Sequence, residues 1–212
     1  MFLTEESYNE TMDLITGRKI PSLLLKDLIV WAKETFQVNV CNYICDTAVT
    51  GLRRLQIVLW DNEVSRKMFD GPNYDKEKQS KIAKKFAELC STYQMHKEYE
   101  DHNSTFVSFE TICDEIQKRV MKKATAEIGQ IQHPDIWKID ICFGSVHIFY
   151  ETDAQISANA ENGISDNLKN QCTQIIRKYD EHNVYSTGAK CVFSSHQTVN
   201  EKYAGSMFYY NR

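Results

Sequence analysis

The stretch that decides the fold is IWKIDICFGSVHIFYE, residues 136–151. Two runs of strand-forming residues flank Gly144-Ser145, and a glycine followed by a small polar residue is typical of a type II′ two-residue hairpin turn. We therefore predict a β-hairpin with its turn at these two residues. In that register Cys142 and His147 are direct cross-strand neighbours, so their side chains point to the same face.

Because side chains alternate along a strand, the predicted register sorts the hairpin into two faces. The first face is apolar and is predicted to belong to the core; it carries Trp137, Ile139, Ile141, Phe143, Val146, Ile148 and Tyr150. The second face is mixed and is predicted to be either solvent-exposed or a functional site; it carries Lys138, Asp140, Cys142, His147, Phe149 and Glu151.

The rest of the chain alternates between helical and strand patterns. The order helix, hairpin, helix occurs twice, over 22–36, 38–60 and 74–93 and again over 108–130, 136–151 and 164–181, although no residues match between the two copies. This arrangement favours an α+β fold, with helices packed on an antiparallel sheet of β-hairpins at about 38–60, 136–151 and 188–211. Because no linker-like or low-complexity stretch occurs, we predict a single domain over residues 1–212.

The composition is that of an ordinary globular protein. The chain has 212 residues, of which 42% are hydrophobic and 25% charged, and its formal net charge is −4. Its seven cysteines include no CxxC motif, and the N-terminus, MFLTEESYNETMD, turns acidic too soon for a secretory signal. We therefore expect reduced thiols and a cytoplasmic location. No apolar run approaches the length that spans a bilayer, so we expect no membrane partner.

The mixed face of the central hairpin offers the clearest chemical hypothesis. A thiolate nucleophile needs a base nearby and a group that orients the base, and this face supplies Cys142, His147, Asp140 and Glu151. These four residues are the candidate catalytic set of a hydrolase or transferase. The simpler interpretation is the solvent face of an amphipathic hairpin, and we favour it because no signature surrounds the cysteine. We expect no cofactor and no metal.

Two other groups of residues are candidates for binding a partner protein. Arg53 and Arg54 follow a predicted turn, where they could contact an acidic partner, although a local pair between Arg53 and Asp46 explains them more simply. Tyr209 and Tyr210 belong to a terminal aromatic run, and tyrosine is enriched at protein interfaces. The simpler interpretation of this run is a half-buried final strand.

Taken together, these features favour a small cytoplasmic accessory or immunity-type protein that acts by binding another protein. The richness in Asn, Ile, Lys and Tyr is typical of AT-rich genomes and favours a bacterial source. The alternative is the hydrolase or transferase described above. Nucleic-acid binding ranks third, because the net charge is negative and Glu77 and Glu88 interrupt the lysine-rich helix surface at 76–85.

Overall fold

The computed structural model describes residues 3–48, 51–61 and 65–212. The chain divides into two compact units, 1–115 and 116–212, and the boundary lies inside helix α5 (Ile112–Ile128). The prediction of one domain over residues 1–212 stays a prediction.

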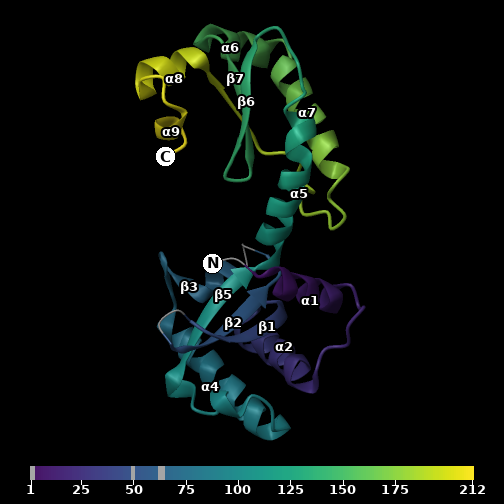
Figure 1. The fold of residues 1–212 in the computed structure, drawn as a ribbon, viewed down its shortest axis with the longest axis vertical. Coiled ribbons are helices and arrows are strands. Elements are labelled where there is room, and N and C mark those ends of the chain that lie inside the picture. The colour runs from purple at the N-terminus through teal and green to yellow at the C-terminus, as the bar shows by residue number, and fades with distance from the viewer. Residues whose placement is uncertain (1–2, 49–50, 62–64) are drawn as a thin grey trace. The chain divides into compact units, whose positions relative to one another are not determined.

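Unit 1 contains a three-stranded sheet flanked by helices (Figure 1). Its elements are α1 (Glu5–Ile15), α2 (Leu23–Phe36), β1 (Val40–Thr47), β2 (Arg53–Leu59), η1 (Arg66–Met68), β3 (Phe69–Asp70), β4 (Asn73–Tyr74), α4 (Lys76–Tyr93), η2 (Lys97–Tyr99), η3 (His102–Ser104) and β5 (Thr105–Thr111). The strand order is β1-β2-β5, with β1 antiparallel and β5 parallel to β2. The predicted hairpin at 38–60 is therefore confirmed.

The helices of unit 1 begin at side chains that cap them. Thr4 accepts a hydrogen bond from the backbone N–H of Ser7, and Ser22 accepts one from that of Leu25. The apolar stripes of α2 and α4 then pack on one face of the sheet. This core contains Leu24, Leu25, Leu28, Leu55, Ile57, Leu59, Ile82, Phe86, Val107 and Phe109.

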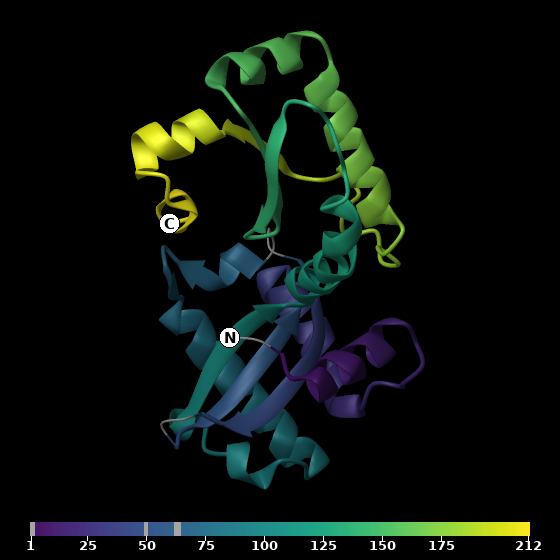
Figure 2. The ribbon, with the colours of Figure 1, turned by 45° about the horizontal axis from the view of Figure 1, so that its top comes forward.

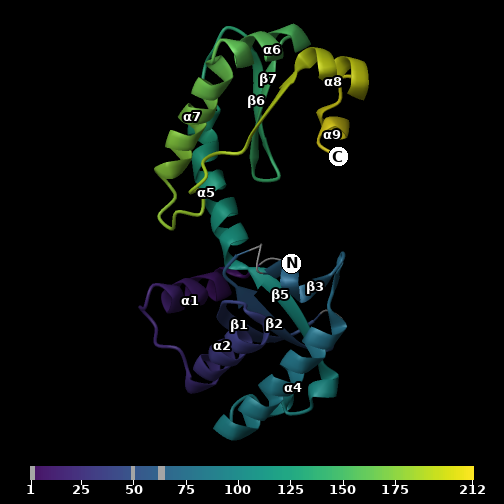
Figure 3. The same ribbon diagram turned by 180° about the vertical axis from the view of Figure 1, so that it is seen from behind.

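Unit 2 contains a second three-stranded sheet, which Figure 3 shows from behind. After α5 come β6 (Ile136–Cys142), β7 (Ser145–Tyr150), α6 (Asp153–Glu161), α7 (Ile164–Arg177), β8 (Cys191–Ser195), α8 (His196–Tyr203) and α9 (Met207–Tyr210). The order is β6-β7-β8, with β6 antiparallel and β8 parallel to β7. Both units therefore follow one topology: a hairpin, a helical crossover, and a third strand parallel to the second.

The predicted α+β class is confirmed, but the predicted sheet is wrong in two respects. The strands form separate mixed sheets instead of one antiparallel sheet, and no hairpin forms at 188–211. Residues 207–210 are helical because Ser206 caps them, accepting a hydrogen bond from the backbone N–H of Tyr209. Aromatic residues favour strands only where a sheet surface receives them, so local context overrides this propensity.

The register predicted for the central hairpin is also wrong. The turn residues are Phe143 and Gly144, with φ of 48° and 73°, which is the positive-φ pair of a type I′ turn. Asp140 therefore lies opposite His147, and Cys142 opposite Ser145. The pairing has shifted by two residues, an even number, so the alternation between the faces is preserved.

A β-bulge between Ile136 and Lys138 makes one exception to that alternation. The extra residue turns Trp137 away from its predicted apolar face and against Phe149, where the two ring centroids are 6.0 Å apart in an edge contact. Phe143 also leaves the predicted core face, because it occupies the turn. The remaining apolar positions on β7, Val146, Ile148 and Tyr150, are buried as predicted.

Candidate functional site

The mixed face of the central hairpin is covered by the C-terminal segment. Phe149 is fully buried, and its ring centroid lies 5.0 Å from that of Tyr210 on α9. Tyr210 also contacts His147, at 5.8 Å, and Tyr203, at 5.3 Å, both edge-on. This face is therefore a second apolar layer of unit 2, and the prediction that it is solvent-exposed is wrong for Phe149.

Three aromatic side chains on the hairpin turn and on α9 are exposed. Phe143 at the hairpin turn is 90% exposed, and on α9 Phe208 is 69% and Tyr209 57% exposed. Figures 1 and 3 show α9 beside the β6–β7 hairpin within unit 2. The Arg212 guanidinium lies over the Phe208 ring, 5.9 Å from its centroid. We call Phe143, Phe208 and Tyr209 the aromatic surface.

Phe143 is unfavourable to the fold in two ways. Its φ of 48° lies in the left-handed region. This conformation costs about 1–2 kcal/mol for residues other than glycine, asparagine and aspartate. Its ring gains little from burial, because 90% of the residue stays exposed. Asparagine or aspartate is the usual residue at this position of a type I′ turn. The folded state thus gains little from a phenylalanine here.

The four candidate catalytic residues do not form one hydrogen-bonded set. Both Cys142 and His147 are described, and no hydrogen bond joins them; the Nδ1 of His147 is buried without a partner. Asp140 accepts a hydrogen bond from Lys138 at 3.2 Å. Glu151 lies 3.4 Å from the Nδ1 of His196 and, four residues along an extended chain, roughly 13 Å from His147.

The electrostatics of His147 follow from its position under α9. Burial lowers its pKa, and the nearby Asp140 carboxylate opposes this effect while Lys190 adds to it. Within the part of the chain that the structure describes, no group of three or more His, Cys, Asp or Glu side chains is placed to hold a metal ion. Catalysis by Cys142, His147, Asp140 and Glu151 stays a prediction, with Asp140 in place of Cys142 as the direct neighbour of His147.

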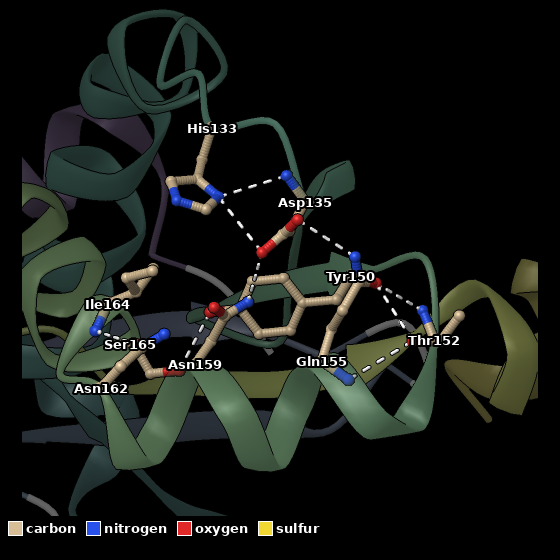
Figure 4. A network of polar contacts seen from close by, with 9 residues as sticks. All are labelled: His133, Asp135, Tyr150, Thr152, Gln155, Asn159, Asn162, Ile164 and Ser165. Atoms are coloured by element: carbon tan, nitrogen blue, oxygen red, sulfur yellow. Dashed lines mark hydrogen bonds and ion pairs between the residues drawn. The ribbon is translucent and has the colours of Figure 1, made fainter.

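A polar network in unit 2 connects the chain before β6 with α6 (Figure 4). The Asp135 carboxylate accepts hydrogen bonds from Gln155 and Asn159, both at 3.1 Å. The backbone N–H of Asp135 donates to the Nδ1 of His133 at 3.2 Å, so a neutral His133 carries its proton on Nε2. Gln155 also closes the capping box of α6 with Thr152. Since the backbone N–H and both carboxylate oxygens of Asp135 are hydrogen-bonded within unit 2, this network stabilises the fold.

The two predicted basic residues also have partners. Arg54 is only 9% exposed; its Nε donates to Asp46 at 2.7 Å and its Nη2 to the other carboxylate oxygen. This bidentate contact raises the pKa of Arg54. Arg53 donates to the backbone carbonyl of Glu98. The predicted Arg53–Asp46 pair is therefore wrong, because the register places Arg54 opposite Asp46. Partner binding by Arg53 and Arg54 stays a prediction.

Sequence reasoning missed Phe143 and Phe208 as surface residues. The available signal for Phe143 was its place directly before Gly144, where a shifted turn includes it. Tyr209 was identified, and it is exposed. Tyr210 was identified too, but its ring packs against Phe149 on β7. A helix that could cross a membrane was not found in the described part of the chain.

Comparison with known proteins adds no functional information: no protein-family model, curated protein or solved structure matches this chain.

Proposed function

We propose that this protein acts by binding another protein through the aromatic surface of unit 2. The observation that carries the proposal is Phe143, which combines a left-handed backbone with a ring that is 90% exposed. A residue that the fold itself does not favour is better explained by a contact made outside the fold.

Two further side chains support the same location. Phe208 and Tyr209 lie on α9, which is anchored to β7 by the buried contact between Tyr210 and Phe149. They are therefore exposed on a short helix that the core of unit 2 holds in place. Exposed aromatic side chains on a supported backbone are typical centres of protein interfaces, and Arg212 over Phe208 adds a second residue type that is enriched there.

The chemistry of the surface favours a protein partner over a nucleic acid. The chain carries a formal net charge of −4, whereas binding to phosphates requires a basic surface. The narrower assignment as a cytoplasmic accessory or immunity-type protein belongs to the same proposal and is supported only by the size and acidity of the chain. Among the residues that the structure describes, no contact specifically favours the alternative catalytic function.

The proposal can be tested by photo-crosslinking in native cells. A benzophenone amino acid replaces Phe143 or Tyr209, and in the matched control it replaces Val30, an exposed apolar residue on α2 in unit 1. We expect discrete crosslinked products from positions 143 and 209 that contain the same partner protein, and none of them from position 30. Identical products from all three positions, or none from 143 and 209, would refute the proposal.

The affinity for the partner recovered in this way gives a second measurement. Aromatic centres of interfaces typically contribute about 2 kcal/mol or more, so Tyr209→Ala is expected to weaken binding roughly 30-fold. Phe143→Asn is expected to weaken binding while leaving the hairpin folded, since asparagine accepts the type I′ turn. Unchanged affinity in both variants would contradict the assignment of the surface.

A further inference from the structure

Unit 2 brings together two thiols that lie outside the aromatic surface. Cys172 is on α7 and is fully buried, whereas Cys191 is the first residue of β8 and is half-buried. Both are free thiols, and their side chains are in hydrogen-bond contact although the loop after α7 separates them in the sequence. Two cysteines can be joined by a disulfide only where the backbone already brings their sulfur atoms together. This pair meets that requirement.

The path of the chain between α7 and β8 holds the two thiols together. Figure 2 shows that the chain turns after α7 and passes beside this helix before it enters β8. The hydroxyl of Thr173 accepts a hydrogen bond from the backbone N–H of Ala189 at 3.0 Å and donates one to the carbonyl of Lys169 at 2.8 Å. At Gly188, φ is +86°, and a Cβ atom would lie 3.2 Å from the same hydroxyl oxygen. The chain therefore approaches α7 closely just before Cys191.

The other side of this segment is bonded to the sheet. The backbone N–H of Val146 on β7 donates to the carbonyl of Lys190 at 2.9 Å, and Cys191 is the partner of Val146 in the parallel ladder. Cys191 is therefore fixed between β7 and α7. Since both thiols lie on hydrogen-bonded backbone, their contact is a property of the fold of unit 2.

The surroundings make the two thiols chemically unequal. The hydrogen bond from Cys172 lowers the pKa of Cys191; burial opposes this effect, and the Lys169 ammonium adds to it. The same hydrogen bond, together with burial, raises the pKa of Cys172. Cys191 is also the more exposed of the two. An oxidant therefore meets Cys191 first, as a thiolate, while Cys172 waits behind it as a protonated thiol.

Cys142 provides an internal comparison. It is a half-buried free cysteine in the same unit, but it lies on β6, where its strand partner is Ser145 instead of a thiol. A difference in oxidation between Cys142 and Cys191 would therefore reflect the paired thiol and the nearby lysine, since the degree of burial is similar.

We propose that Cys172 and Cys191 are a redox-modification site, at which a peroxide converts the two thiols to an intramolecular disulfide between α7 and β8. The Cys191 thiolate attacks one oxygen of hydrogen peroxide, the O–O bond breaks, and the departing hydroxide takes a proton from solvent to become water. The sulfur of Cys172 then attacks the sulfenic acid on Cys191, the S–O bond breaks, and the hydroxyl leaves as water with the Cys172 proton.

The electrons balance in this sequence. The two cysteines together lose two electrons and become one disulfide, and these electrons reduce one peroxide to two waters. A dithiol reductant reverses the change by thiol–disulfide exchange. The site does not depend on the aromatic surface, so either proposal can fail without the other.

The test treats the full-length chain with hydrogen peroxide, blocks the remaining thiols in denaturant and digests the chain with trypsin without reductant. Cleavage after lysine and arginine places Cys172 in residues 170–177, Cys191 in residues 191–202 and Cys142 in residues 139–169. Mass spectrometry should detect 170–177 joined to 191–202, and a dithiol reductant should separate them. Cys142 should stay reduced at the peroxide concentration that completes this link. Equal oxidation of Cys142 and Cys191, or no link between the two peptides, would overturn the proposal.

Two variants test the order of the steps, and Cys142→Ser is their matched control. Cys172→Ala removes the resolving thiol, so the sulfenic acid on Cys191 should accumulate and react with dimedone, whereas the unchanged chain should show little such labelling. Cys191→Ser should leave Cys172 reduced under peroxide, and Cys142→Ser should form the disulfide normally. Oxidation of Cys172 that persists in Cys191→Ser would overturn the proposed order. The mass-spectrometric test on the unchanged chain stands even if Cys172→Ala fails to fold.

Discussion

Replacement of Phe149 by alanine is expected to destabilise unit 2 by about 3–5 kcal/mol, the range found for phenylalanine in a close-packed core. The burial and contacts of this side chain place the expected cost in the upper part of that range. It is fully buried, and its ring packs edge-on against Trp137 at 6.0 Å and Tyr210 at 5.0 Å. Alanine would remove the buried ring surface, leave a cavity between these partners and release the contact that holds α9.

The measurement is urea unfolding followed by tryptophan fluorescence. Trp137 is the tryptophan of unit 2 and contacts Phe149, whereas Trp31 and Trp60 belong to unit 1. With both of the latter replaced by phenylalanine, the emission reports on unit 2 alone. The matched control is Phe208→Ala, which changes the same residue type at an exposed position and should cost less than about 0.5 kcal/mol. If Phe149→Ala costs under about 1 kcal/mol, or no more than this control, the C-terminal segment does not cover this face.

Three further outcomes are expected. Phe143→Asn should stabilise unit 2 by about 0.5–1 kcal/mol in the same urea assay, because asparagine relieves the left-handed strain and no buried contact is lost. A destabilised variant would contradict the type I′ turn. Asp46→Ala should lower the free energy of unfolding by about 1–3 kcal/mol, because it leaves the buried guanidinium of Arg54 without its bidentate partner. Asp13→Ala, which breaks an exposed ion pair, should change it by no more than about 1 kcal/mol. Equal effects of the two substitutions would contradict the difference in burial. The pKa of His147 is lowered in the folded state, so as the pH falls through about 6.5 the unfolded chain takes up a proton before the folded one does, and the free energy of unfolding falls. His147→Gln should therefore reduce the loss of unfolding free energy between pH 7.5 and pH 5.5. An unchanged loss would show that His147 does not contribute to it.

Part of the candidate site was predictable from residue types alone. Tyr209 stood out because tyrosine is common at interfaces, and it is exposed. Phe143 was assigned to the core, since a phenylalanine beside a predicted turn reads as the last residue of an apolar face. Only the pairing of Cys142 with Ser145 moves the turn by one residue and places Phe143 in it. Small changes in register therefore decide which aromatic residues reach the surface.

By itself, the sequence determined the local features of this protein: the alternation along the 136–151 hairpin, the helix that begins after Ser22, and the α+β class. These features depend on neighbours within a few residues, and a register shift of two leaves the alternation intact. The tertiary structure decided that β5 and β8 join their sheets in parallel, and that α9 covers Phe149. Such contacts join residues far apart in the chain, and their free energy comes from burying surfaces that exist only after the elements have formed.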